Sequence, residues 1–230
     1  MSTKQNSFFP VEQVFLFVDL QGSFTMPGEK HYQERPCIAF IKEKVLPFLV
    51  CNLNLTWIRA LEIISDYRQP RPGDLDESCV PGTTGYKSLL ESEEDFQPLY
   101  LEIINQRRRW VKCMNSPVWV REGIGEEKVR PGLPYEDPAR FTSWLNWCIG
   151  EPRKDLKITL CGLTLDCCVL CVAQALRFRG YNVNVLREAV DVYQYDPEGT
   201  LKEALLVKGG VVRNWAHVIL WGDFTKGFAN

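Results

Sequence analysis

Lys157-Ile158-Thr159-Leu160-Cys161-Gly162 is the stretch that decides the fold, because it is a short hydrophobic strand that breaks at a glycine. An apolar helix is predicted to follow, from about residue 168 to residue 179, and Gly180 is a typical residue just beyond a helix end. Residues 181–186 alternate in a way that predicts a second strand. Strand, helix and strand in this order indicate a right-handed crossover between parallel strands.

Strand and helix signals also alternate along the rest of the chain. We expect further strands at residues 14–18, 55–64, 118–120 and 218–221, and helices at residues 36–48, 98–113, 137–149 and 200–207. The centre of residues 55–64 is also compatible with a helix. Residues 65–94, rich in Pro, Gly, Asp and Ser, are expected to form a long loop with at most a short helix near its end. The alternation predicts an α/β fold, with an about six-stranded, mainly parallel sheet between helices on both faces, in one domain over residues 1–230.

The composition favours a cytoplasmic protein that acts on a small molecule. The 230 residues are 45% hydrophobic and 24% charged, which suits one large domain with a buried core. A net charge of -2 offers no basic surface for nucleic acid or for an anionic membrane. Nine cysteines, an odd number, indicate reduced thiols rather than a disulfide framework. Met1 to Pro10 lacks the basic start and apolar run of a signal peptide, and no stretch approaches the roughly 20 apolar residues of a membrane span.

Cys168 is the candidate nucleophile, because the predicted topology places it at the carboxyl edge of a parallel strand and at the start of a helix. The first N–H groups of a helix have no partner within the helix, so they favour the thiolate form of a cysteine. The same N–H groups can bind an oxyanion that forms on a substrate carbonyl. The alternative is a buried packing residue, since free cysteines are often interior.

Three motifs in a fixed order carry a resemblance to a known family. They are Val18-Asp19-Leu20-Gln21 followed by Phe24, the loop Cys79-Val80-Pro81-Gly82-Thr83-Thr84-Gly85, and Gly162-Leu163-Thr164-Leu165-Asp166-Cys167-Cys168-Val169 followed by Gly180-Tyr181. Together they resemble the isochorismatase-like cysteine hydrolases, the group that contains nicotinamidases, N-carbamoylsarcosine amidohydrolase and ureidoacrylate amidohydrolase. The likeness extends over nearly the whole chain and implies a three-layer α/β/α fold.

The resemblance implies roles for several residues. Cys168 would be the nucleophile, and Asp19 would take its proton and later pass it to the leaving amine. The oxyanion would lie against the backbone N–H groups of Thr164 and Cys168, after a cis peptide bond between Leu163 and Thr164. The resemblance therefore implies amide hydrolysis through a thioester, in a protein that forms homo-oligomers. Without the other motifs, Asp19 would equally well be an aspartate that caps the turn after its strand.

The chain differs from nicotinamidases in the residues that hold their metal, which are an Asp-x-His pair and a further histidine. It has Asp66-Tyr67-Arg68 and Ser78 in those places, and Arg68 would repel a cation. Its only histidines, His31 and His217, match neither place. We therefore expect no metal and no other cofactor, and Asp66 is as much a hydrogen-bonding loop residue as a ligand.

The lysine of the family's Asp, Lys, Cys triad lies at the end of its third strand. Arg121 follows the strand predicted at residues 118–120, so it is expected to hold that place and to keep Cys168 ionised by its permanent charge. Lys128 is the alternative cation. The basic run Arg107-Arg108-Arg109 is expected to be a solvated helix face.

Three functions are compatible with these observations. The first is a metal-independent cysteine hydrolase of a small amide, ureido or carbamoyl compound. The second is a catalytically silent relative that binds a small ligand or a protein partner, which the replaced lysine and histidines favour. The third is a thiol redox protein that uses Cys168 and Cys171, a Cys-x-x-Cys pair at a helix start.

Overall fold

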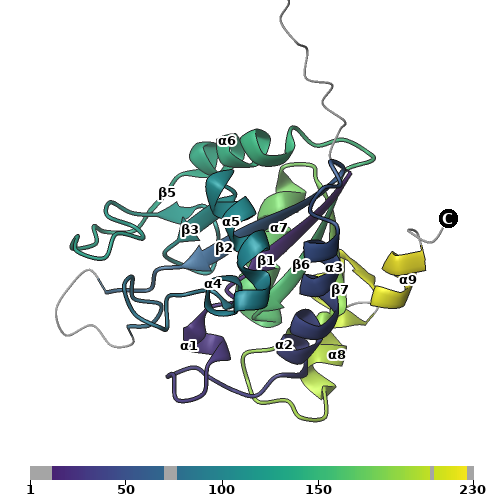
Figure 1. The fold of residues 1–230 in the computed structure, drawn as a ribbon, viewed down its shortest axis with the longest axis horizontal. Helices are drawn as coiled ribbons and strands as arrows, with labels where there is room; N and C mark the ends of the chain where they lie inside the picture. Colours follow the sequence, from purple (N-terminus) through teal and green to yellow (C-terminus); the bar gives the residue numbers. More distant parts are fainter. Residues whose placement is uncertain (1–11, 70–76, 208–209, 227–230) are drawn as a thin grey trace, which may run out of the picture.

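The computed structural model describes residues 12–69, 77–207 and 210–226 of the chain (Figure 1). Their central element is a six-stranded sheet in the order β3-β2-β1-β6-β7-β8, in which every neighbouring pair of strands is parallel. The expected parallel sheet is thereby confirmed, whereas Met1 to Pro10 and part of the predicted long loop lie outside the described residues. The strands are β1 (Gln13–Val18), β2 (Ile58–Ser65), β3 (Arg109–Lys112), β6 (Lys157–Leu163), β7 (Asn182–Asp191) and β8 (His217–Ile219).

Strand β1 lies at the centre of the sheet because its side chains are apolar on both faces. None of the five side chains from Val14 to Val18 is exposed, as expected for a strand that helices cover on both sides. Phe15 and Phe17 pack into one hydrophobic cluster, and the alternate residues pack into another on the opposite face. The sheet therefore has two apolar faces that helices must cover.

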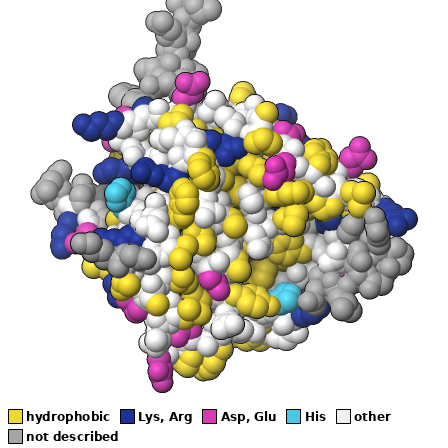
Figure 2. Space-filling view, turned by 180° about the vertical axis from the view of Figure 1, so that it is seen from behind, with side chains coloured by type: hydrophobic (Ala, Val, Ile, Leu, Met, Phe, Trp, Pro, Cys, Tyr) yellow, Lys and Arg dark blue, Asp and Glu magenta, His cyan; other side chains and the backbone are white. Residues whose placement is uncertain are grey.

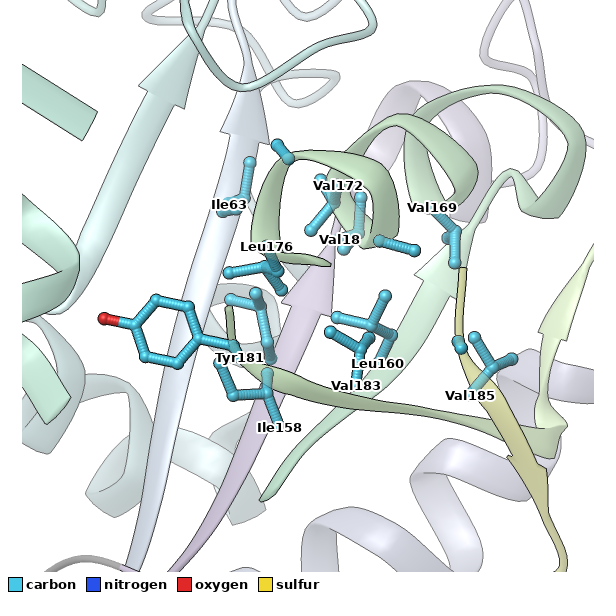
Figure 3. Close-up of a cluster of buried hydrophobic side chains, with 14 of the residues drawn as sticks. Val18, Ile63, Ile158, Leu160, Val169, Val172, Leu176, Tyr181, Val183 and Val185 are labelled. Carbon is cyan, nitrogen blue, oxygen red and sulfur yellow. The ribbon is translucent and has the colours of Figure 1, made fainter. Parts of the chain in front are cut away.

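Helices cover both faces, so the fold has three layers (Figure 1). In Figure 3, Val172 and Leu176 lie in the cluster with Val18 and Leu160 of the sheet. The face of Phe15 packs against α2 (Pro36–Phe40), the π-helical turn η1 (Ile41–Val45), α3 (Leu46–Cys51) and α5 (Gln97–Asn105), and the other face packs against α6 (Pro138–Ile149), α7 (Leu170–Phe178) and α8 (Thr200–Leu206). The remaining helical segments are α1 (Gly22–Thr25), α4 (Leu89–Ser92), η2 (Glu94–Phe96), η3 (Leu165–Val169), η4 (Val212–Asn214) and α9 (Trp221–Lys226).

Residues 98–113 and 118–120 differ from the sequence-based prediction. The predicted helix ends at Asn105, Arg107 takes a left-handed conformation with φ 54°, and the chain then enters β3. Strand β4 (Trp119–Val120) is not in the main sheet, because it pairs antiparallel with β5 (Tyr135–Glu136) in a two-stranded ribbon. The prediction was wrong because β3 has only 4 residues, Arg-Trp-Val-Lys, and so lacks the apolar run that marks a buried strand.

The basic run before β3 is not wholly a solvated face. Arg109 lies within the strand, its side chain is 14% exposed, and its guanidinium lies 2.8 Å from a carboxylate oxygen of the fully buried Glu62. Arg109 therefore neutralises a buried acid on the neighbouring strand. The alternative that residues 55–64 form a helix is also excluded, since they overlap β2.

The order of the sheet reverses between β1 and β6. Strands β2 and β3 lie to one side of this pair, and β7 and β8 lie to the other. Open parallel sheets bind their ligands outside the carboxyl ends of the strands at such a point. A site is therefore expected just after Val18 and Leu163, the last residues of the two strands.

None of the helices in residues 12–69, 77–207 and 210–226 has the length and apolar character needed to cross a membrane. On the face seen in Figure 2, hydrophobic side chains gather in a band through the middle, and Lys and Arg lie mostly toward the edges. Acidic side chains are scattered over the same face.

Candidate active site

Four polar side chains meet at the carboxyl edge of the sheet, beside the point where its order reverses. Asp19 follows β1, Ser65 ends β2, Lys112 ends β3, and Cys168 lies in the helical turn after β6. These strands are parallel, so their carboxyl ends lie at the same edge. All four residues are buried.

The ammonium group of Lys112 is the centre of this group. Its Nζ lies 2.8 Å from Asp19 Oδ2, 2.6 Å from Ser65 Oγ and 2.9 Å from Tyr67 Oη. Cys168 Sγ lies 3.4 Å from the same nitrogen. The lysine side chain is 0% exposed and Asp19 is 1% exposed, so each charge has the oppositely charged partner that a buried charge requires.

Asp19 is fixed by the end of β1 and by Ser65. Its φ is 48°, in the left-handed region that aspartate enters more readily than most side chains. Its Oδ1 accepts a hydrogen bond of 2.8 Å from the Ser65 hydroxyl. The buried Gln21 amide holds the Ser65 backbone, donating to its carbonyl at 2.9 Å and accepting from its N–H at 2.6 Å. The carboxylate therefore has one orientation, toward Lys112.

Cys168 reaches the same place because β6 approaches β1 closely at Gly162. This glycine has φ 124°, and a Cβ there would lie 2.1 Å from the carbonyl oxygen of Val18, so no larger residue fits. The peptide bond between Leu163 and Thr164 is cis, as predicted. Segments η3 and α7 follow directly, so the N–H groups of Thr164 and Cys168 lie at the amino end of a helix, where the helix dipole favours negative charge.

Burial opposes ionisation of the cysteine. It raises the pKa of the Cys168 thiol, and the Asp19 carboxylate raises it further, while Lys112 and a hydrogen bond with Tyr67 lower it. The direction is opposite to the one expected from the helix start, because burial removes the hydration that a thiolate needs. Burial alone lowers the pKa of the Lys112 ammonium, but the charge of Asp19 raises it well above its usual value. These two directions favour a charged lysine and a protonated thiol.

The cation beside Cys168 is Lys112, not Arg121 or Lys128 as the sequence analysis expected. Lys112 is the last residue of β3, the strand that lies where residues 118–120 were predicted to lie. Lys128 is exposed, and the guanidinium of Arg121 binds elsewhere. The error in the strand assignment thus caused the error in the site.

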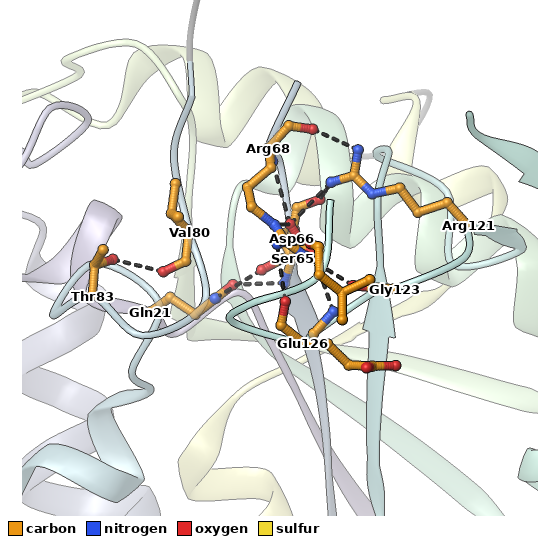
Figure 4. Close-up of polar contacts among 11 residues, drawn as sticks. Gln21, Ser65, Asp66, Arg68, Val80, Thr83, Arg121, Gly123 and Glu126 are labelled. Atoms are coloured by element: carbon orange, nitrogen blue, oxygen red, sulfur yellow. Dashed lines mark hydrogen bonds and ion pairs between the residues drawn. The ribbon is translucent and has the colours of Figure 1, made fainter. Parts of the chain in front are cut away.

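Arg121 belongs to a second network, around Asp66 (Figure 4). Arg68 donates to both carboxylate oxygens, with distances of 3.0 Å to Oδ1 and 2.7 Å to Oδ2, and Arg121 lies 2.9 Å from Oδ1. The Gly125 N–H donates to Oδ2 at 2.8 Å. Burial alone raises the pKa of Asp66, but the hydrogen bonds from Arg68 and Gly125 and the charge of Arg121 lower it below its ordinary value. Arg68 also donates to the carbonyl groups of Gly123, Glu126 and Val129.

This network does not fit a metal ion at Asp66. Both oxygens of the carboxylate already accept hydrogen bonds, and a cation placed on them would lie against the guanidinium of Arg68. Across the part of the chain that the structure describes, no group of three or more His, Cys, Asp or Glu side chains is arranged to hold a metal. The guanidinium group of Arg68 therefore provides a positive charge beside the Asp66 carboxylate.

A cavity of about 680 Å³ opens at Cys168, large enough for a small organic molecule. Asp19, Thr164 and Cys168 all line it, so the structure brings these three predicted residues together. The wall also includes Phe24, His31, Tyr67, Arg68, Asn115, Trp119, Arg121, Leu163, Cys171 and Tyr193.

The sequence analysis did not assign a role to Ser65, Tyr67 or Lys112. Ser65 and Lys112 carry one readable signal: each is the last residue of a strand that neighbours β1 or β2 in a parallel sheet, where functional side chains gather. Tyr67 carries none, because its position depends on how the chain turns after β2.

Comparisons with known proteins place the fold. No protein-family model and no curated protein sequence matches the chain. Among solved structures, the chain is similar to an isochorismatase-like hydrolase from Alkaliphilus metalliredigens, with a TM-score of 0.61, 13% identity, and coverage of 95% of this chain and 99% of that one. It is also similar to nicotinamidase/pyrazinamidase from Bacillus subtilis, with a TM-score of 0.55, 15% identity, and coverage of 90% and 99%. A pyrazinamidase of Pyrococcus horikoshii in complex with zinc gives a TM-score of 0.54, 18% identity, and coverage of 91% and 99%. The chain therefore has the three-layer fold of these hydrolases.

Proposed function

We propose that this protein, which has the fold of the isochorismatase-like hydrolases, is a cysteine-dependent hydrolase of a small amide, ureido or carbamoyl compound. One observation carries the proposal: a buried Lys112 lies 2.8 Å from the Asp19 carboxylate and 3.4 Å from the Cys168 thiol, at the edge of a cavity. A nucleophile, a carboxylate that accepts its proton and a fixed cation are the groups that covalent acyl transfer requires.

The mechanism begins with proton transfer from Cys168 to Asp19. The thiolate attacks the carbonyl carbon of the substrate, and the negative charge that forms on the carbonyl oxygen lies against the N–H groups of Thr164 and Cys168. Asp19 then gives its proton to the leaving amine, which leaves a thioester on Cys168. A water molecule that loses its proton to Asp19 hydrolyses the thioester and restores the thiol. Throughout the cycle, Lys112 remains charged and balances the negative charge that moves between carboxylate and sulfur.

No step of this mechanism is assigned to a metal. The Pyrococcus horikoshii structure is described as a complex with zinc, whereas here both oxygens of Asp66 accept hydrogen bonds from Arg68. Aromatic side chains such as Phe24, Trp119 and Tyr193 give the cavity wall an apolar, planar character.

Two alternatives are weaker on specific grounds. The replaced lysine and the replaced histidines favoured a silent binding protein; Lys112 contacts both Asp19 and Cys168, so only the replacement of the histidines by Arg68 and Ser78 still favours it. The redox alternative rested on the Cys168 and Cys171 pair, but Cys168 Sγ contacts the Lys112 ammonium at 3.4 Å and the Tyr67 hydroxyl at 3.2 Å.

Ammonia release tests the proposal. The wild-type protein is incubated with a panel of nicotinamide, pyrazinamide, N-carbamoylglycine and 3-ureidopropionate, and ammonia is measured over time. We expect hydrolysis of at least one compound, and loss of that activity by a factor of about 1,000 or more in Cys168→Ala and Asp19→Asn. Cys51→Ser is the matched control, because Cys51 is an exposed thiol outside the site. Full activity in Cys168→Ala would refute the proposal, and binding of a panel compound without hydrolysis would favour the silent protein.

A further inference from the structure

The hydroxyl group of Tyr67 contacts the sulfur of the proposed nucleophile. Its Oη lies 3.2 Å from Cys168 Sγ and 2.9 Å from Lys112 Nζ. Tyr67 is not one of the Asp, Lys and Cys residues of the resemblance, and it comes from the segment after β2, between Asp66 and Arg68. Its hydroxyl therefore lies between the cation and the sulfur.

The three protons of the Lys112 ammonium have four acceptors. Asp19 Oδ2, Ser65 Oγ and Tyr67 Oη lie 2.6 to 2.9 Å away, at ordinary hydrogen-bond distances, and Cys168 Sγ is the most distant at 3.4 Å. Ser65 uses its own proton to donate to Asp19 Oδ1, so its oxygen accepts from the lysine. The three oxygen atoms thus accept the three hydrogen bonds that the ammonium group can donate, and no proton of Lys112 is left for Cys168 Sγ.

The proton of the Tyr67 hydroxyl is available for the sulfur. A phenol donates one hydrogen bond and accepts others, and this oxygen faces the ammonium, which can only donate. The two acceptors within reach of its proton are Cys168 Sγ at 3.2 Å and the more distant Asn115 Oδ1 at 3.5 Å. Once the sulfur is a thiolate, it is the stronger acceptor, because hydrogen bonds to charged groups are about twice as strong as neutral ones.

We infer that Tyr67 is a catalytic residue that donates its O–H to the Cys168 thiolate and transmits to it the positive charge of Lys112. Lys112 polarises the phenol by donating to its oxygen, and the phenol in turn stabilises the negative sulfur. The inference rests on the proposed function, since it concerns the activation of the same nucleophile. It adds a fourth side chain, Tyr67, to the three that act in the mechanism.

The role of Tyr67 is open to a direct test, the rate of iodoacetamide alkylation at Cys168. Only the thiolate reacts, so at a pH below the pKa each unit of pKa increase lowers the rate tenfold. Tyr67→Phe removes one oxygen atom and keeps the ring. Loss of one hydrogen bond to a charged group should raise the pKa of Cys168 by about one to two units. The rate at pH 8, followed by peptide mass spectrometry with the modified cysteine localised, should therefore fall about 10- to 100-fold.

Tyr100→Phe is the matched control, because Tyr100 lies on α5, where its ring stacks with Arg109 of β3, and it is not part of the cavity wall. A second variant excludes a packing effect: 3-fluorotyrosine at position 67 keeps the shape of the ring but lowers the pKa of the phenol, which strengthens its donation. It should accelerate alkylation at Cys168, whereas a residue that only fills space would leave the rate unchanged. Equal rates in wild type, Tyr67→Phe and the fluorotyrosine variant would overturn the inference, as would a loss of rate in Asn115→Ala alone.

Failure of the proposed function has a different signature. In that case the wild-type protein hydrolyses no amide, yet the effect of Tyr67 on the alkylation rate of Cys168 still appears if the donor role is correct. Conversely, hydrolysis that depends on Cys168 together with an unchanged alkylation rate in Tyr67→Phe would retain the proposed function and remove the role of Tyr67.

Discussion

Replacement of Lys112 by methionine is the perturbation whose effect follows most directly from the geometry. Methionine has nearly the length of lysine but no charge, so the variant keeps most of the packing and leaves the Asp19 carboxylate, 1% exposed, without its cation. Breaking a buried ion pair by removing one partner costs about 3–5 kcal/mol, because the remaining charge is uncompensated. The Ser65 hydroxyl still donates to Asp19, which places the expected loss toward the lower end of that range.

Urea unfolding of Lys112→Met, Asp19→Asn and the double variant measures this loss. A domain of ordinary stability, about 5–15 kcal/mol, still folds after a loss of about 3 kcal/mol, so the midpoint should shift without a change in slope. The double variant buries no charge at this position and should recover at least half of the loss. A Lys112→Met variant within about 1 kcal/mol of wild type at neutral pH, with no recovery in the double variant, would refute the buried pair.

Other variants and conditions test the remaining parts of the structure. Arg121→Met removes one of two cations at the buried Asp66 and should lower the free energy of unfolding by about 1–3 kcal/mol. Lys128→Met, at an exposed position, should change it by less than about 0.5 kcal/mol. Equal effects of the two variants would contradict the assignment of Arg121 to the Asp66 network. Gly162→Ala forces a Cβ against the Val18 carbonyl and should cost about 3 kcal/mol or more, so a variant as stable as wild type would mean that β6 and β1 do not approach as described. The pKa of Lys112 is higher in the folded than in the unfolded protein, so its contribution to stability is complete below the unfolded pKa of about 10.4 and is lost as the pH rises through the folded pKa. The free energy of unfolding should therefore not fall between pH 8 and 10 because of Lys112. A fall in this range that is present in the wild type and absent in Lys112→Met would contradict this expectation. Dialysis against a chelator should leave activity and thermal midpoint unchanged, and a protein that loses activity on chelation and regains it with zinc would show that Asp66 is free to bind metal.

The sequence predicts the parts of the site that follow long apolar strands. Asp19 follows a run in which every residue is hydrophobic, and Cys168 follows an apolar strand that has a glycine just before its last residue, so both positions can be read from the pattern. The parallel sheet with helices on both faces follows from the same strands, and it is the fold found here.

Lys112 could not be found in this way, because its strand is short and half basic. Arg-Trp-Val-Lys has no apolar run, and its lysine is buried by pairing with Asp19, a residue 93 positions earlier in the chain. Tertiary pairing of this kind has no local signal. The role of Arg68 was likewise hidden, since a sequence shows that a histidine is replaced but not that the arginine then folds back onto Asp66.

The measurement that tests the central claim most directly is the mass of the protein during turnover. An amide that the wild-type protein hydrolyses is mixed with it, the reaction is stopped with acid within milliseconds, and the peptide with Cys168 is analysed by mass spectrometry. The account predicts a transient increase equal to the acyl group of the substrate, located on Cys168 and absent in Asp19→Asn. Turnover without an adduct on Cys168, or with the adduct on another residue, would contradict it.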